Sequence, residues 1–318
     1  HQALTEEVIK FFNASYPQQP ILDDEGEHII RGSQEEDSGI RWMQHYYDPV
    51  YNRGLVLGNP DSNPNLAMIS AAGFVSPSAK AWAESSELQE GGFSRLFGGI
   101  VTGHFDNEDD YSWERGIYEY TWGDKKRGLE SLGHVLHLIE DSSVPDHTRN
   151  DPHPGLESRL ASRITPQAFL AYLGGHDVTN GSPYEGFAIF RRGSLNIAED
   201  LRDEQPKHFS TLAEYFDALA SYSNSNFFSG DTIFSKDYER PNIVFEKIEI
   251  IDSQNIKFIY ASDNFFNFKL VGQLKKFDWQ KEIQSDDFFL TDPDHLILSD
   301  YWRLLSRQAV LHGAGVVK

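Results

Sequence analysis

The segment from Gly133 to His153, GHVLHLIEDSSVPDHTRNDPH, contains four of the 12 histidines of the chain together with four acidic residues. These residue types supply the imidazole nitrogens and carboxylate oxygens that bind zinc and related divalent ions. Within the segment, His137 and Asp141 are four residues apart, so on a helix their side chains lie on one face. That spacing indicates two metal ligands held in a fixed relation by one helix.

Further histidines flank this pair. His134 lies one helical turn earlier, and Pro145 predicts that the helix has ended before His147 and His153. A helix that carries two ligands, followed by a loop that carries more, can close around an ion. The alternative is a solvent-facing helix on which His and Asp form only a surface ion pair.

The composition narrows the chemistry. The 318 residues include no cysteine, so thiolate metal sites and cysteine nucleophiles are excluded and any metal must be held by His, Asp and Glu. The formal net charge of −21 disfavours sequence-independent binding of nucleic acid unless metal ions supply positive charge. No apolar run approaches the roughly 20 residues that a membrane span needs.

Two places near the start of the chain carry the same residue types. In the segment GSQEEDSGIRWMQHYYDP (32–49), the consecutive acidic residues Glu35, Glu36 and Asp37 are followed eight positions later by His45. The chain begins with His1, directly before a predicted helix. The aromatic residues around His45 either line a substrate pocket, where they suit a quaternary ammonium group, or pack in the core.

Four segments together resemble the zinc-dependent phospholipases C of bacteria, which share a helical fold with the three-zinc single-strand nucleases of fungi and plants. LHLIEDSSVPDH is similar to the central helix-loop motif of that family, with the same spacing from His to Asp and to the next His. HYYDP, SPYEGFA (182–188) and HQALTEEVI are similar to three further ligand-bearing segments of the family. The resemblance spans residues 1 to about 235 and resumes in the last helix.

The resemblance implies two or three zinc ions and a ligand set for each. The first zinc would be held by Asp37, His45, His137 and Asp141, the second by His147, His153 and a glutamate, and the third by His1 and Asp141, which would bridge. It also implies that Asp37 acts as the general base or orients the attacking water. His134, Asp146 and Asp151 would orient ligand imidazoles or be ordinary capping and surface residues.

The chain departs from the family pattern at three ligands. The third zinc of the family also takes the amino group and carbonyl of an N-terminal tryptophan, which is not in this sequence. Asp37 is closer to His45 than in the best-known members, so Glu35 and Glu36 are rival ligands. The glutamate of the second site is either Glu185, whose surroundings match, or Glu157, which lies four residues after His153.

The chemistry that the resemblance implies is hydrolysis of a phosphodiester. Divalent ions neutralise the charge that develops on the phosphoryl oxygens and make hydroxide available near neutral pH. The leading expectation is a secreted or periplasmic phospholipase C that releases diacylglycerol and a phosphorylated head group, with peripheral membrane contact and no stable nucleic-acid partner. A single-strand nuclease or nucleotidase is the second hypothesis, and a non-catalytic metal-binding or adhesion protein is the third.

These ligands need helices to position them. Apolar residues recur at three- and four-residue intervals over 109–141, which predicts a long helix with a polar break near Gly123. Residues 242–275 are rich in Ile, Val, Phe and Tyr between short polar turns, which predicts a small antiparallel sheet. We therefore expect one mainly α domain over 1–318, a helical bundle of the phospholipase C and zinc nuclease type. It would carry a β excursion before the last helix and an irregular insertion at 156–181.

Overall fold

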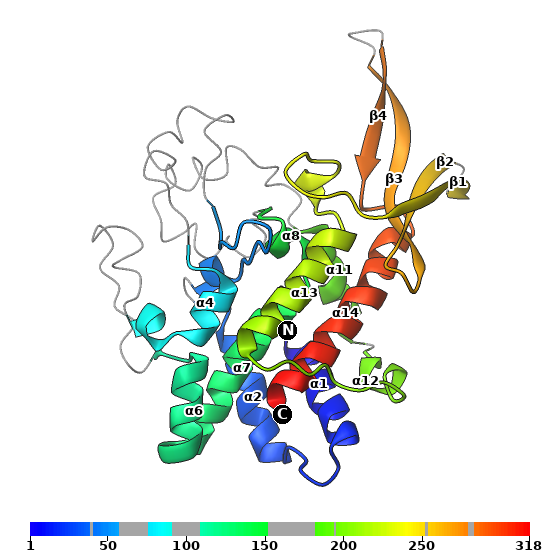
Figure 1. Cartoon of the computed structure of the whole chain (residues 1–318). Coiled ribbons are helices and arrows are strands. Elements are labelled where there is room, and N and C mark those ends of the chain that lie inside the picture. Colours follow the sequence, from blue (N-terminus) through cyan, green and yellow to red (C-terminus); the bar gives the residue numbers. More distant parts are fainter. Residues whose placement is uncertain are drawn as a thin grey trace.

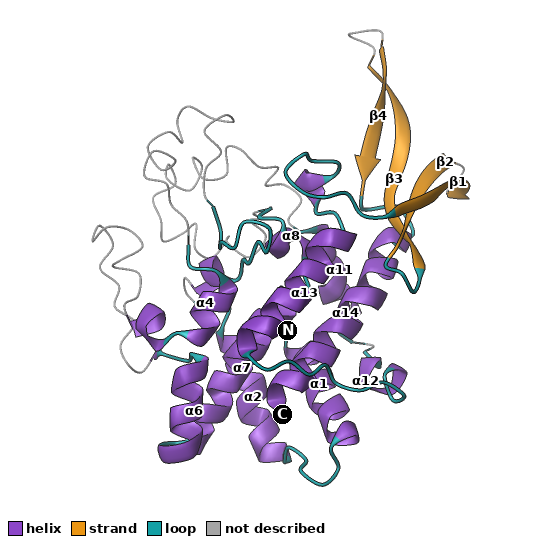
Figure 2. Cartoon of the chain, viewed as in Figure 1, coloured by secondary structure: helices purple, strands orange, loops and turns teal. Residues whose placement is uncertain are grey.

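The computed structural model of the chain describes residues 1–38, 41–56, 76–90, 109–151, 182–193, 195–251, 254–278 and 283–318. Helices form one body, and a twisted sheet stands beside one end of it (Figures 1 and 2). The insertion expected at 156–181 lies outside the described residues. No helix in the described ranges is long and apolar enough to cross a membrane.

The helical elements occur in the following order and bounds. They are α1 (Gln2–Ser15), α2 (Asp23–Glu35), η1 (Arg41–Gln44), α4 (Ala79–Glu84), α6 (Trp113–Trp122), α7 (Lys125–Asp141), α8 (Pro145–Thr148), α11 (Pro183–Arg191), α12 (Ile197–Asp200), α13 (Leu212–Asn226), η4 (Gly230–Thr232) and α14 (Leu296–Val317).

The long helix expected over 109–141 is two helices. Gly123 ends α6 with a backbone conformation outside the helical region (φ −115°, ψ −130°), and Asp124 caps α7 by accepting a hydrogen bond from the amide of Lys126. Helix α6 turns back and packs against α7. Of the periodic apolar residues of α6, Trp113 packs against the core of the helical body, whereas Ile117 and Tyr120 are more than half exposed, so their spacing indicated a helix but not the turn after it.

Helix α7 packs most closely against α2, and glycines make this possible. A Cβ atom on Gly32 of α2 would overlap the carbonyl group of Glu130, and one on Gly133 of α7 would overlap the carbonyl oxygen of Ile29. The two backbones therefore touch at this crossing. The contact places the end of α2, where Asp37 follows, beside His137 in the last two turns of α7.

The sheet has four antiparallel strands in the order β1-β2-β3-β4. They are β1 (Ile243–Ile251), β2 (Gln254–Ser262), β3 (Asn267–Asp278) and β4 (Ile283–Phe289). The segment predicted as 242–275 thus contains the first two strands and most of the third. The fourth strand was missed, because IQSDDFF places four consecutive polar residues in its middle and shows no alternation of apolar and polar residues.

The expected fold class, a mainly α helical bundle of the phospholipase C type with a small β excursion, is wrong. The sheet extends to Phe289 and builds a second hydrophobic core, separate from the one inside the helical body. In that second core, Phe258 and Phe268 of the sheet are buried with Phe227 and with Tyr301 of α14. The apolar side of these strands must be covered by a helix, so the arrangement combines helices with a substantial antiparallel sheet.

Helix α14 belongs to both cores. Its first half, with Ile297 and Tyr301, packs in the cluster under the sheet, and its second half, with Val310 and Ala314, packs among α1, α7 and α13. The sheet stands at the N-terminal end of this helix (Figure 1). The two cores are therefore joined along one continuous element.

Replacing Gly32 by Ala should destabilise the chain. The new methyl group would meet the backbone of Glu130, which cannot move away as a flexible side chain could, so we expect a loss of about 1–3 kcal/mol in the free energy of unfolding. The matched control is Gly26→Ala on the same helix, where the nearest atom is 3.7 Å from the new Cβ and helix propensity improves. Urea unfolding measures the free energy of unfolding of both variants. Equal changes in the two would contradict the close backbone contact between α2 and α7.

His312, near the end of α14, should make stability depend on pH. Its ring is buried, donates through Nδ1 to the carbonyl of Gln308 at 2.7 Å and stacks on Phe209, and burial lowers its pKa to about 4. Because the unfolded pKa is near 6.5, this contribution is fully present above pH 6.5 and is lost as the pH falls toward 4.

The expected loss for the wild-type chain is about 2 kcal/mol between pH 7 and pH 5 from this residue alone. In His312→Asn, which cannot titrate, urea unfolding at the two pH values should show a change smaller by that amount. His208→Asn, at a neighbouring histidine, serves as the control. A His312→Asn variant with the same pH dependence as the wild type would contradict the assignment.

Candidate metal centre

Four imidazole rings surround one buried carboxylate, that of Asp141 at the end of α7. The distances are 3.1 Å from His45 Nδ1 and 3.3 Å from His137 Nε2 to Oδ2, and 3.1 Å from His147 Nδ1 and 3.3 Å from His1 Nε2 to Oδ1. Neither oxygen of Asp141 accepts a hydrogen bond in the described structure. The nitrogens are thus close to the carboxylate but are not directed at it as donors.

Besides α7, five separate segments contribute ligand candidates. His1 precedes α1, Asp37 follows α2, His45 follows η1, His147 lies on α8, and Glu185 lies in the first turn of α11. Pro145 at the first position of α8 and Ser182 at the cap of α11 start these two short helices, which aim their side chains back at the end of α7.

Three groups of side chains have ligand atoms close enough to hold a metal ion, all within 4.8 Å of one another. The groups are His1, His137 and Asp141; Asp37, His45 and His137; and Asp141, His147 and Glu185. His137 and Asp141 each belong to two groups. Asp141, with two carboxylate oxygens, could serve two ions at once, whereas His137, with only Nε2 free, could serve one of its two groups.

The orientation of His137 identifies its free nitrogen. Its Nδ1 lies 2.7 Å from the backbone carbonyl oxygen of Ser33, and because a carbonyl can only accept, Nδ1 must carry the hydrogen. In the neutral ring, Nε2 then presents a lone pair, and this buried atom has no hydrogen-bond partner in the described structure. It faces Asp141 Oδ2 at 3.3 Å and Asp37 Oδ1 at 3.6 Å.

Lone pairs that face one another at this range repel unless a cation lies between them. In a tetrahedral zinc site with bonds of about 2.0–2.1 Å, neighbouring ligand atoms are about 3.3 Å apart. The contacts of His45, His137 and His147 with Asp141 span 3.1–3.3 Å. The donor set and its spacing therefore fit divalent metal ions.

The ionisable groups of the cluster shift one another's pKa values. Burial raises the pKa of Asp141, but the adjacent imidazoles of His147 and His45 outweigh it and hold that pKa well below its usual range. Burial lowers the pKa of His45 to about 4. Burial also lowers the pKa of His1, but the charges of Asp141 and Glu140 and the hydrogen bond to Glu140 outweigh it and raise the value to about 10.

Glu140 belongs to this centre although sequence reasoning did not select it. The side chain is buried, Oε2 accepts a hydrogen bond from His1 Nδ1 at 3.0 Å, and Oε1 accepts one from the hydroxyl of Thr5 at 2.8 Å. With Nδ1 held in this way, His1 Nε2 is directed toward Asp141. Only the packing of α1 against α7 brings these residues together, so spacing along the sequence could not show it.

Glu36 and His134 occupy a neighbouring buried network rather than the metal groups. The Glu36 carboxylate accepts hydrogen bonds from Arg41 Nε at 2.6 Å, Trp82 Nε1 at 3.2 Å and His134 Nδ1 at 2.5 Å. Burial raises its pKa, but Arg41, His134 and His45 together outweigh burial and lower it to about 2. Among the rival acids after α2, Asp37 is therefore the one that faces the centre, and Glu36 anchors the segment behind it.

The structure describes only some of the residues that were expected to hold the second zinc. It brings Glu185 to His147 and Asp141. His153 and Glu157 lie outside the described residues. Asp146, another candidate for orienting ligands, accepts a hydrogen bond from the hydroxyl of Ser182 at 2.8 Å and so links α8 to the start of α11.

The centre opens into a cavity of 740 Å³. Ligand candidates form one part of its wall, and apolar side chains, including Trp42, Tyr184, Ile189 and Trp302, form another. Tyr46 also lines the cavity and packs against the ring of His147 (4.7 Å between centroids). Tyr47 instead is buried and binds Lys80 and Asp217, so of the aromatic residues expected near His45, two line the cavity and one does not.

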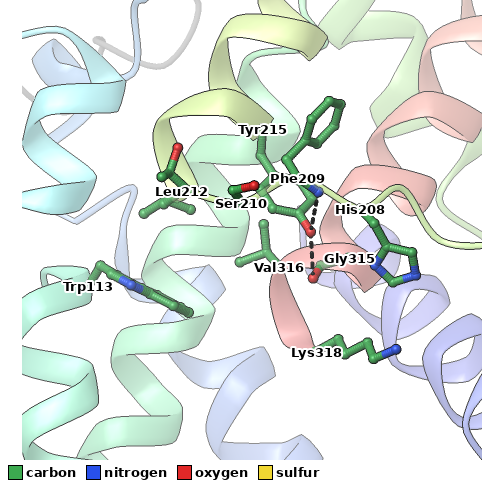
Figure 3. Close-up of a pocket in the computed structure, with 10 residues that line it drawn as sticks. Trp113, His208, Phe209, Ser210, Leu212, Tyr215, Gly315, Val316 and Lys318 are labelled. Atoms are coloured by element: carbon green, nitrogen blue, oxygen red, sulfur yellow. Dashed lines mark hydrogen bonds between the residues drawn. The ribbon is translucent and has the colours of Figure 1, made fainter.

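A second cavity, of 340 Å³, lies near the end of α14 and contains none of the grouped ligands. There, Tyr215 Oη donates to the carbonyl of Gly315 at 3.0 Å and accepts from the amide of Phe209 at 3.3 Å (Figure 3). These polar groups satisfy one another. The cavity beside Asp141 is therefore the candidate functional site.

Comparisons of the chain with protein-family models, with curated proteins and with solved structures found no match.

Replacing Glu140 by Gln should weaken one metal site by about 10- to 100-fold, because it removes the charge that orients His1 and makes it more basic. The sites that do not use His1 should keep their affinity. The matched control is Glu6→Gln, at a residue that lines the same cavity and accepts a hydrogen bond from the side chain of Gln2. Metal titration against a competing chelator measures both, and equal affinities would contradict the role of Glu140.

Proposed function

We propose that this chain is a multi-zinc phosphodiester hydrolase, and that its substrate is a phospholipid cleaved to diacylglycerol and a phosphorylated head group. The observation that carries the proposal is that three ligand groups adjoin one cavity, and that Asp141, which lines it, belongs to two of them. Two divalent ions held by such groups could stabilise both the attacking and the leaving oxygen of a displacement at phosphorus. The similarity of LHLIEDSSVPDH to the central motif of the zinc-dependent phospholipases C supports it.

The charge of the chain makes metal ions necessary for such a substrate. A phosphodiester is an anion, and the chain has a net charge of −21, with Asp37, Glu140, Asp141 and Glu185 on the wall of the cavity itself. When bound, divalent ions would neutralise negative charge on the phosphoryl group and lower the pKa of water from about 15.7 toward about 7.

The residues of the chain have distinct parts in this proposal. Asp141 is fully buried and stays ionised, so it would bridge neighbouring ion positions throughout. Asp37 is 37% exposed and lines the cavity, which places its carboxylate where it could accept a proton from an attacking water. Ser33 and Glu140 hold the rings of His137 and His1 in fixed orientations.

The cavity wall favours an amphiphilic substrate. Beyond the ligand groups, the wall is formed largely by apolar side chains such as Tyr184, Ile189 and Trp302. Apart from the histidines, Arg192 is the cationic side chain of the lining. A phosphate near the ligands with an apolar group along this wall would match the distribution of polar and apolar surface. A single strand of nucleic acid would instead need a row of cationic side chains.

Metal analysis and two hydrolysis assays test the proposal. Protein purified without chelator should contain at least two zinc-like ions per chain and should release diacylglycerol from lecithin, with activity lost on chelation and restored by zinc. Cleavage of single-stranded DNA in place of lecithin would identify a nuclease. Bound metal with neither activity would favour a non-catalytic metal-binding protein, and fewer than two ions would rule out the multi-zinc mechanism.

Replacing Asp141 by Asn should remove metal and activity together, because the amide oxygen is uncharged and a poorer bridge between two ions. We expect hydrolysis to fall at least 100-fold and metal content to fall in parallel. Asp203→Asn, at a carboxylate that is 95% exposed on the surface, is the control and should change neither. An Asp141→Asn variant with full metal content and full activity would show that Asp141 is not the bridging ligand.

A further inference from the structure

Strand β1 is the outer edge of the sheet. It pairs with β2 on one side only, and in the described part of the chain no strand pairs with its other side. Figure 1 shows β1 on the side of the sheet that is remote from the helical body. A row of backbone amide and carbonyl groups therefore faces solvent along nine residues.

The side chains of this edge are unusually apolar for exposed positions. Ile243, Val244 and Phe245 are 40–44% exposed, Ile248 is 65% exposed and Ile250 is 74% exposed. Exposed edge strands attract other strands unless charged residues or bulges protect them. β1 has a bulge only at its start, between Ile243 and Phe245, and its remaining residues form a regular ladder with β2.

We propose that two copies of this chain pair through their β1 strands, antiparallel and about a two-fold axis at Ile248, to form one continuous sheet of eight strands. The axis must be perpendicular to the sheet, because only that rotation places two identical edges side by side in antiparallel orientation. Each residue i of one copy then faces residue 496 − i of the other, and residues that face each other lie on the same side of the sheet.

The charges of β1 select this register among those that overlap by most of the strand. Axes at Glu246, Lys247 or Glu249 would place that residue opposite itself, which is repulsive. An axis at Ile248 places Ile248 opposite its copy and places Lys247 opposite Glu249 twice, once on each side of the axis. It also places Phe245 opposite Ile251, an aromatic pair with a β-branched residue.

The conformation of the single chain already suits this pairing. The Lys247 Nζ and Glu249 Oε1 atoms are 3.0 Å apart, so the two side chains lie on the same side of the sheet, as the reciprocal pairs require. Glu249 also accepts a hydrogen bond from the hydroxyl of Tyr260 at 2.8 Å and lies 3.6 Å from Lys269 Nζ. A second Lys247 would therefore join a preformed network.

The absence of cysteine from the chain allows a register-specific test. In Ile248→Cys, the two introduced thiols would face each other across the axis with Cα atoms about 4.5–5.5 Å apart, which permits a disulfide. In the control Ile250→Cys, the two thiols would be displaced by four residues along the strand, about 13 Å, which does not. Position 250 is the more exposed of the two, so random collision would favour the control.

The full-length chain is oxidised under mild conditions and examined on non-reducing gels, and the wild type is examined by sedimentation over a range of concentrations. We expect a concentration-dependent dimer of the wild type and at least 10-fold faster cross-linking of Ile248→Cys than of Ile250→Cys. A wild-type chain that stays monomeric at all concentrations, whether or not it binds vesicles, would overturn the proposal. Equal cross-linking at both positions would overturn the register.

A charge reversal provides an independent measurement. Lys247→Glu would place two carboxylates opposite each other on each side of the axis, so the concentration needed for half-dimerisation should rise at least 5-fold. Lys257→Glu is the matched control, because Lys257 lies on β2 and binds Glu246 of the same chain at 2.9 Å. A dimer that Lys257→Glu weakens as much as Lys247→Glu does would contradict pairing through the β1 edge.

Discussion

The burial of the Asp141 carboxylate among four imidazole rings is the constraint to which the rest of the helical body conforms. An ionised carboxylate that accepts no hydrogen bond is costly inside a protein, and here the charge of the adjacent imidazoles offsets that cost. A bound cation would offset it further. Helices α1, α2, α8 and α11 are placed so that residues at or near their ends come close to this one carboxylate. These residues are His1, Asp37, His147 and Glu185.

The direct contact between the backbones of α2 and α7 sets the position of the centre. Because Gly32 and Gly133 let the backbones of α2 and α7 touch, the carbonyl of Ser33 can reach the ring of His137. The two acidic residues that follow α2 lie in different environments. Glu36 turns into a buried network with Arg41, Trp82 and His134, and its neighbour Asp37 faces the cavity. One buried anchor thus determines which of two adjacent acids lies at the centre.

The sequence was most informative where ligands are close along the chain. The four-residue spacing of His137 and Asp141 and the helix break before His147 depend on local geometry, which residue types and intervals express. The contribution of Glu140 and Thr5 depends on how α1 crosses α7, and nothing in either segment specifies that crossing. The resemblance to a zinc-dependent family suggested the distant ligands His1, Asp37, His45 and Glu185, whereas spacing alone would have left them as separate polar residues.

The difference between local and non-local information also explains the errors in the predicted fold. Periodicity over 109–141 identified helical segments correctly but showed only a polar break near Gly123, and three- and four-residue spacing does not tell in which direction α7 continues after that break. Strand β4 has polar residues where a half-buried strand would alternate, so it was missed and the sheet was judged too small. The second core beneath that sheet depends on α14, whose contacts with both ends of the molecule are non-local.

The ligand groups are spread over His1 to Glu185, so no short part of the unfolded chain contains them all. The unfolded chain would therefore have far lower affinity for ions than the folded one, and every ion bound to the folded state adds to its stability by mass action. With the metal ions of the proposed function, free metal concentration would act on the folding equilibrium as well as on the chemistry of the cavity. In a compartment depleted of metal, the helical body would lose this contribution to its stability, whereas the core beneath the sheet contains none of the grouped ligands.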